Sequence, residues 1–353
     1  MRKERYVAYV GTYTHGSSLG IHIFDIDTEK WNMTERKVIP INNPSDVIVS
    51  SNGKYLYSIA DQGVQSFKIL PDGDLEPMNT ADIGGMRGCY LEVDAKDRFL
   101  FVAGYHDGRI SMLPLHEDGT IGDVADGIFH KGIGINTRNR RSVPHVTCVQ
   151  MTPDQGSVCA VDSGLDQVKI YKIDYINGKL RLEDILRGEL DSSPRMIRID
   201  NQRKFAYVLY EMDSDIHVYR VTKQKGGKEV FDFVQSISTV EEREHEQAAA
   251  SGIEFSPDGK HLFVSNAGVN TVSVYDVDKK TGMLTKICEN EISGDYPKML
   301  IVMPDNEHFA VLNNESNEIC IFKMDYEKKY FLMDTKPIKI EQPNCISIHK
   351  LEN

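Results

Sequence analysis

The sequence has few of the features that mark secreted, membrane-spanning or disulfide-bonded proteins. No apolar stretch of roughly 7 to 15 residues resembles a signal-peptide core, and none is long enough to span a bilayer. The six cysteines are dispersed and form no Cys-x-x-Cys pair, which favours buried free thiols over disulfides or a zinc site. We therefore expect a cytoplasmic protein that makes no contact with a membrane.

Positive charge is also scarce, since 41 Lys and Arg residues stand against 53 Asp and Glu residues, for a formal net charge of −12. Nonspecific binding of nucleic acid depends on a basic surface, so nucleic acid is not an expected partner. The sequence leaves the oligomeric state open.

Tryptophan occurs only once, at Trp31. Repeats of the WD40 type carry Gly-His and Trp-Asp pairs in each unit, and neither pair recurs here. Heptads and helix-like apolar periods are missing as well, so the chain is expected to be built from strands.

What the sequence does contain is a short apolar segment that recurs about every 44 to 56 residues. Its seven copies occupy residues 45–50, 89–94, 145–150, 195–200, 251–256, 298–303 and 344–349. A turn and further apolar runs rich in Val, Ile, Tyr and Phe follow most copies, as in Lys54 to Ile59 and Gly63 to Ile69. Four short strands per repeat of this length are typical of propeller blades.

The two ends of the chain each hold part of one repeat. Residues 6–42 contain the second, third and fourth runs without the first, and residues 343–349 supply a first run alone. Joining them would complete a blade and close the ring. The sequence thus predicts an all-β, seven-bladed β-propeller with four antiparallel strands per blade, in a single domain of residues 1–353. The segments 131–143 and 240–247 are expected to be long loops between blades.

Antiparallel geometry indicates which residues meet at the central channel. The first strand of a blade starts where the second strand ends, so residues at these points should share one face of the disc. They are Arg87, His145, Arg195 and Lys298 at the starts of first strands, and His15, Asp61, His106, Asp162, Glu211, Asn266 and Asn313 at the ends of second strands. All are polar or ionisable, which predicts a pocket for a small anionic substrate.

The residue types in this set suit proton transfer near an anion. Arg195 could hold a carboxylate or phosphate, or stabilise an oxyanion, and Glu211 or His145 could act as general base. No Gly-x-Ser-x-Gly segment is present, which disfavours a covalent mechanism. Lys298, Asp61, His106 and Asn266 are expected to contact the substrate.

Ordered segments along most of the chain resemble the lactonase family of seven-bladed propellers, which includes propeller-type 6-phosphogluconolactonases and fungal carboxy-muconate lactonizing enzymes. They include Tyr9-Val-Gly-Thr-Tyr-Thr14, Gly20-Ile-His-Ile-Phe24, Asn43-Pro-Ser45, His130-Lys-Gly-Ile-Gly134, Pro144-His145, Pro194-Arg195, Tyr207-Val-Leu-Tyr-Glu211, Ser256-Pro-Asp-Gly259 and Ser265-Asn-Ala-Gly268. The resemblance implies catalytic roles for His145, Arg195 and Glu211, a substrate-binding role for Arg140 in the loop before Pro144, and neither a cofactor nor a catalytic metal.

The chain also departs from the family's pattern. Thr147 and Met196 replace histidines, and Ala267 and Lys298 replace arginines. Alanine supplies no donor, and lysine lacks the bidentate fork of arginine. The expected activity is hydrolysis of a small anionic sugar lactone, first of all 6-phosphogluconolactone. The alternatives are a non-catalytic propeller that binds an anionic metabolite or a protein, and a muconate-type lactonizing activity.

Overall fold

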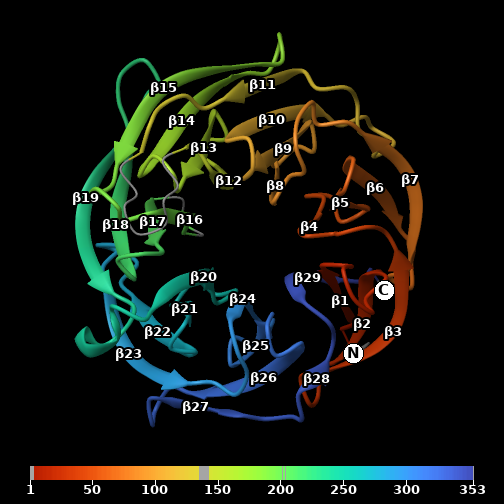
Figure 1. The fold of residues 1–353 in the computed structure, drawn as a ribbon, viewed down its shortest axis with the longest axis vertical. Helices are drawn as coiled ribbons and strands as arrows, with labels where there is room; N and C mark the ends of the chain where they lie inside the picture. The colour runs from red at the N-terminus through yellow and green to blue at the C-terminus, as the bar shows by residue number, and fades with distance from the viewer. Residues whose placement is uncertain (1–3, 135–142, 201, 203, 353) are drawn as a thin grey trace.

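The computed structural model describes residues 4–134, 143–200, 202 and 204–352. These residues form seven antiparallel sheets arranged as blades around a central channel, as Figure 1 shows. The expected seven-bladed propeller is confirmed.

The blades are numbered 1 to 7 around the ring, starting with the blade that holds both chain ends. The inner strand of each blade borders the channel. The inner strands are β29 (Pro343–Lys350), β4 (Val47–Val49), β8 (Tyr90–Val93), β12 (Val146–Met151), β16 (Pro194–Ile199), β20 (Ala249–Phe255) and β24 (Pro297–Val302), for blades 1 to 7 in that order. The second strands are β1 (Tyr6–Thr12), β5 (Tyr55–Ala60), β9 (Phe99–Gly104), β13 (Ser157–Asp162), β17 (Phe205–Tyr210), β21 (His261–Ala267) and β25 (His308–Asn313).

The outer half of each blade follows the same order. The third strands are β2 (Gly20–Asp27), β6 (Gly63–Ile69), β10 (Arg109–Pro114), β14 (Gln167–Asp174), β18 (Asp215–Lys223), β22 (Thr271–Val277) and β26 (Glu318–Asp325). The fourth strands are β3 (Asn32–Pro40), β7 (Leu75–Ala81), β11 (Asp126–Phe129), β15 (Lys179–Arg187), β19 (Glu229–Ser238), β23 (Leu284–Glu291) and β27 (Tyr330–Met333).

The second strands are the most deeply buried part of the blades. Every residue of β9, β13, β17 and β25 is buried, because both faces of these strands pack against neighbouring blades. Burying one large apolar side chain stabilises a fold by about 1.5–3 kcal/mol. Stability therefore comes from the faces between blades, which leaves the channel free to carry polar groups.

The chain ends close the ring within blade 1, where N and C lie side by side in Figure 1. Strand β29 pairs with β1 from Tyr6 opposite Lys350 to Thr12 opposite Pro343. The expected completion of the N-terminal blade by the C-terminal strand is confirmed, and it removes two open sheet edges.

Two details differ from a uniform four-stranded repeat. In blade 7, both β27 and the short β28 (Ile338–Lys339) pair with β26, so the outer edge is split. The segment before β20 contains a single 3-10 turn, η1 (Glu242–Glu244). All six cysteines are free. None of the described helical segments has the length and apolarity that a membrane-crossing helix requires.

Candidate functional site

The inner strands carry a β-bulge near the start of the pairing with the second strand in five blades. The bulged residues are Thr147, Arg195, Ser251, Lys298 and Asn344. A bulge inserts one unpaired residue and re-aims its side chain. All five line one central cavity, together with Ser45 and Cys89 at the corresponding places in blades 2 and 3.

These side chains form hydrogen bonds that run from blade to blade around the channel. In each pair, the side chain of the first residue donates to the backbone carbonyl of the second. The pairs are Ser45 to Gly88, Cys89 to Val146, Thr147 to Arg195, Arg195 Nε to Ser251, Ser251 to Pro297, and Asn344 to Ser45. Lys298 is different, because its ammonium group donates to the Tyr13 hydroxyl in blade 1 at 3.3 Å. These hydrogen bonds hold the side chains of the inner strands in place around the cavity.

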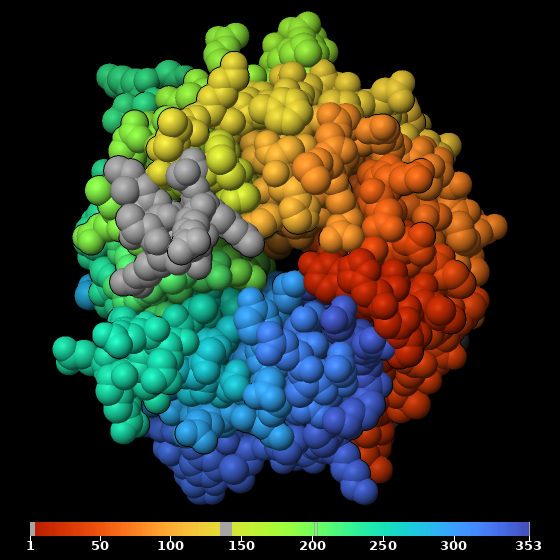
Figure 2. Space-filling view, viewed as in Figure 1, coloured from red at the N-terminus to blue at the C-terminus, as the bar shows by residue number. Residues whose placement is uncertain are grey.

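The cavity has a volume of about 600 Å³, which is in the range of small-molecule sites. Figure 2 shows its mouth as a hollow near the centre of the disc, between the red N-terminal blade and the blue C-terminal blade. The residues that come next in the sequence after five of these positions also line the cavity, and they are Asp46, Tyr90, Met196, Met299 and Cys345.

Arg195 and Glu211 form an ion pair in the wall of the cavity. Arg195 Nη1 donates to Glu211 Oε2 at 2.8 Å, and both side chains are largely buried. Burial alone would lower the pKa of Arg195, but the Glu211 carboxylate and Tyr296 outweigh this effect and raise it. The guanidinium is therefore permanently charged, and its orientation is fixed at Nε and Nη1 by Ser251 and Glu211.

The His145 side chain has one ring nitrogen engaged by the protein. Its Nδ1 lies 2.7 Å from the backbone carbonyl oxygen of Tyr105, and its ring stacks on the Tyr105 ring with centroids 4.3 Å apart. A carbonyl can only accept, so Nδ1 carries a proton and donates it. Nε2 has no hydrogen-bond partner in the described part of the chain. In neutral His145, the basic lone pair therefore belongs to Nε2.

Asp162 holds the backbone on which His145 is mounted. Its Oδ1 accepts from the backbone N–H groups of His145, Gly164 and Leu165 at 2.9 to 3.1 Å. Its Oδ2 lies 2.6 Å from Nδ1 of the buried His130. Both carboxylate oxygens are used within the fold, so Asp162 supports the cavity wall from behind.

The cationic groups of Arg87 and Lys298 both lie near the Tyr13 ring in the cavity. The Arg87 guanidinium lies 5.5 Å and the Lys298 ammonium 4.7 Å from the centroid of the Tyr13 ring. Burial and the positive charges of Arg195 and Arg87 lower the pKa of Lys298 to about 8. Arg87 pairs with Asp61 at 3.3 Å, whereas Lys298 forms no ion pair with any described residue and is the more available cation for an anion.

The structure brings six of the eleven residues that strand geometry had selected to the cavity. They are Arg87, His106, His145, Arg195, Glu211 and Lys298. Asp61 lies on the exposed rim, where its Oδ1 accepts from Asn43 at 2.8 Å and from Arg87 at 3.3 Å. His15 is exposed and stacks on Tyr13. Arg140 lies outside the described residues.

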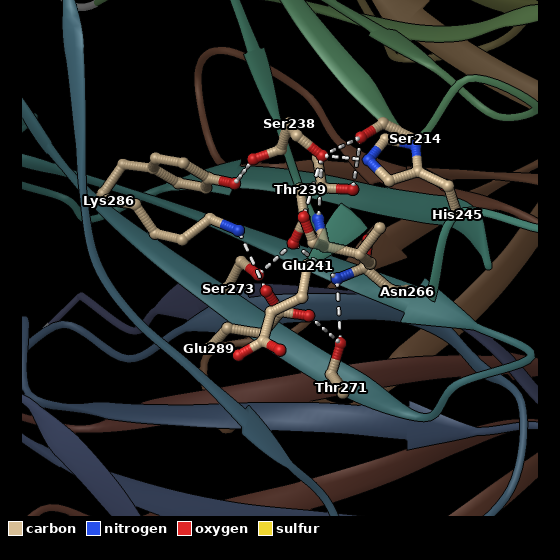
Figure 3. A network of polar contacts seen from close by, with 12 residues as sticks. Ser214, Ser238, Thr239, Glu241, His245, Asn266, Thr271, Ser273, Lys286 and Glu289 are labelled. Carbon is tan, nitrogen blue, oxygen red and sulfur yellow. Dashed lines mark hydrogen bonds and ion pairs between the residues drawn. The ribbon is translucent and has the colours of Figure 1, made fainter. Parts of the chain in front are cut away.

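Asn266 is not brought to the cavity, although it was expected to contact the substrate. It is fully buried, and its amide nitrogen donates to the Thr239 carbonyl at 3.3 Å and to the Thr271 hydroxyl at 3.1 Å. Figure 3 shows it within a polar network that joins β21 and β22 to residues 238–241. The reason is that β21 continues through Ala267, so Asn266 still points sideways within the blade. Asn313 makes a similar contact with the Ser293 carbonyl at 2.9 Å.

Sequence reasoning missed Tyr13, Tyr105, Tyr296 and Asp46, all of which line the cavity. Tyr13 and Tyr105 follow second strands, so the rule that found His106 could have found them. No group of three or more His, Cys, Asp or Glu side chains in the described ranges is placed to hold a metal ion.

Comparisons with known proteins agree with this architecture. The family described as "Lactonase, 7-bladed beta-propeller" matches residues 7–348. The chain is 28% identical over 348 residues to the 6-phosphogluconolactonase of Bacillus subtilis (strain 168), covering 97% of this chain and 98% of that protein.

Solved structures show the same fold along nearly the whole chain. A Bacteroides fragilis protein provisionally assigned as a 6-phosphogluconolactonase superposes with a TM-score of 0.88 at 28% identity, covering 98% of both chains. The periplasmic gluconolactonase of Pseudomonas aeruginosa superposes with a TM-score of 0.91 at 22% identity, covering 99% of this chain and 100% of that chain, which supports the fold alone.

Proposed function

The chain belongs to the family of seven-bladed β-propeller lactonases, and on this premise we propose that it hydrolyses a small anionic sugar lactone, 6-phosphogluconolactone first of all, in the central cavity. The relative from Bacillus subtilis is named for this substrate. Fold and family alone do not fix a reaction, so the proposal depends on the side chains of this cavity.

His145 is the general base in this proposal. Its Nδ1 donates to the Tyr105 carbonyl, which leaves Nε2 to accept a proton from the attacking water. Glu211 is the weaker candidate, because its carboxylate is engaged by Arg195 at 2.8 Å. The 2.7 Å contact of Nδ1 with the Tyr105 carbonyl oxygen is the single observation that carries the assignment.

Arg195 stabilises the oxyanion that develops on the lactone carbonyl. Its Nε and Nη1 are bound by Ser251 and Glu211, so the guanidinium enters the reaction already oriented. Preorganised donors of this kind typically contribute about 10²- to 10³-fold in rate. Glu211 acts through Arg195 and is a positioning residue.

Arg87 and Lys298 bind the acidic group of the substrate. The Lys298 ammonium has only the Tyr13 hydroxyl as a hydrogen-bond partner in the described ranges, so it has donors to spare. Lysine binds phosphate as a compact point charge, whereas arginine prefers the planar carboxylate or phosphate fork. An anionic lactone is thus favoured over a neutral one.

The experiment compares 6-phosphogluconolactone, δ-gluconolactone and a muconolactone as substrates of the purified protein, each corrected for spontaneous opening. The proposal expects the phosphorylated lactone to have the highest kcat/KM, and Lys298→Met to reduce that advantage about tenfold or more. Turnover of none of the three would contradict it. Thermal stabilisation by 6-phosphogluconate without turnover would indicate the non-catalytic alternative.

A further inference from the structure

We propose that Asp46 is the general acid that protonates the ring oxygen of the lactone as the C–O bond breaks. This inference rests on the proposed function and adds a catalytic residue to it. Opening a sugar lactone expels an alkoxide, which is a poor leaving group unless a proton reaches it. Arg195, Lys298 and Arg87 supply positive charge, and His145 takes a proton from water, so another group must donate a proton to the ring oxygen.

The position of Asp46 fits this role. It directly precedes β4, and it lines the cavity next to Ser45. Its Oδ2 accepts the backbone N–H of Leu91 in blade 3 at 2.7 Å, which fixes the orientation of the carboxyl group. Asp46 is therefore a held carboxyl group in the same cavity as His145 and Arg195.

The surroundings of Asp46 favour its protonated form. Burial raises the pKa of Asp46 to about 7, against the backbone N–H groups of Leu91 and Val47, the Arg198 charge and the Cys345 thiol, which all lower it. The other titratable groups that interact with it are Cys89, Tyr90, Glu92 and Cys148. The carboxyl group of Asp46 can thus carry a proton near neutral pH.

The proton balance closes. Water adds to the carbonyl carbon while His145 Nε2 takes one of its protons, and the carbonyl π electrons move to the oxygen facing Arg195. When the carbonyl re-forms, the bond to the ring oxygen breaks and that oxygen takes the proton of Asp46. The products are a hydroxy acid, protonated His145 and ionised Asp46. Transfer of a proton from His145 to Asp46 through solvent restores the starting state.

The test uses Asp46→Asn with Glu92→Gln as the matched control. Both substitutions remove the carboxyl group of a partly buried side chain, directly before β4 for Asp46 and within β8 for Glu92. Both keep an oxygen that accepts the same backbone N–H group, that of Leu91 for Asp46 and that of Met151 for Glu92. Burial raises the pKa of Glu92 to about 7 as well, but Glu92 does not line the cavity. The measurement is kcat and KM for 6-phosphogluconolactone between pH 5.5 and 8.5, with the melting temperature as a check of folding.

Asp46→Asn should lower kcat about 10²-fold or more with KM within about threefold, as expected for loss of a general acid. In the wild type, kcat should fall as the pH rises through about 7, since only protonated Asp46 can donate. This fall should vanish in Asp46→Asn and remain in Glu92→Gln, whose kcat should stay within about threefold of wild type.

A second substrate distinguishes loss of proton donation from a structural effect of the Asp46→Asn substitution. Dihydrocoumarin expels a phenolate, which needs a proton far less than a sugar alkoxide does. The loss caused by Asp46→Asn should therefore be at least tenfold smaller on dihydrocoumarin than on 6-phosphogluconolactone. Equal losses on both substrates, a wild-type pH profile in Asp46→Asn, or a kcat within threefold of wild type would each overturn the role of Asp46 alone. An inactive wild type would overturn the proposed function itself.

Discussion

Arg195 Nη1 lies 2.8 Å from Glu211 Oε2, and this pair joins the bulge at the start of β16 to the residue that follows β17. The bulge allows Arg195 to enter the cavity, and Glu211 fixes its direction. Substitution of Arg195 removes the charge itself, whereas substitution of Glu211 removes only the group that orients it. The two changes should therefore affect catalysis differently.

Arg195→Met should lower kcat for the lactone about 10²- to 10³-fold, because the oxyanion loses its donor. Glu211→Gln should cost less, about tenfold, since the amide oxygen can still accept from the guanidinium. Steady-state kinetics on the folded variants would check this order. The exposed pair of Arg243 and Glu241 offers a control, and Arg243→Met should leave kcat unchanged. A larger loss from Glu211→Gln than from Arg195→Met would contradict the assignment and point to Glu211 as the base.

The pH dependence of substrate binding should follow Lys298. Its pKa is lowered to about 8, so the ammonium is charged below that pH and loses its charge as the pH rises through it. KM for an anionic lactone should therefore increase above about pH 8 in the wild type. In Lys298→Arg, whose side chain stays charged, KM should be flat to pH 9. A wild-type KM that does not change between pH 7 and 9 would argue against Lys298 as a ligand of the anion.

Asn266 should be important for stability and dispensable for turnover. Its buried amide supports residues 239 and 271 through two hydrogen bonds, and removing a buried partner of this kind typically costs about 1–3 kcal/mol. Asn266→Ala should lower the free energy of unfolding in urea by this amount and leave kcat within about threefold. Loss of activity at unchanged stability would instead support a contact between Asn266 and the substrate.

Closure of the ring should depend on β29. Removing residues 343–353 would expose the edge of β1 and take Cys345 and Ile346 out of the faces that they pack against. We expect this variant to be aggregated or unfolded, by circular dichroism and size-exclusion chromatography, whereas removal of residues 352 and 353 alone should be tolerated. A folded monomer without β29 would show that the last strand is not needed to close the ring.

The blade count could be predicted from the sequence because each opening strand is short, apolar and followed by a turn. The split edge at β28 could not, since a two-strand edge and one long strand share the same composition. The channel face was predictable for Arg195 and Glu211 from antiparallel pairing, and the same rule also selected Asn266. That rule locates the end of a strand to within a residue or two, and a shift of one residue turns a side chain from the channel into the blade.

The bulges explain why His145 and Arg195, which look equivalent in the sequence, take different positions in their blades. His145 and Arg195 begin equivalent segments in the sequence, yet the residue of blade 4 at the bulge is Thr147. His145 lies two residues earlier, where the Tyr105 carbonyl can reach its ring. A bulge adds one unpaired residue without changing the apolar pattern, so the sequence contains no signal that separates these two positions. Asp46 was missed because its surroundings come from other blades, and only the closed ring brings them together.

The role of His145 Nε2 as the base in opening an anionic lactone is tested by acid release from saturating 6-phosphogluconolactone in the wild type and in His145→Gln. His116→Gln, on an exposed turn, is the matched control. Turnover should be well above the spontaneous rate for wild type and His116→Gln, and about 10²- to 10⁴-fold less for folded His145→Gln. Equal rates for wild type and His145→Gln would contradict this role of His145.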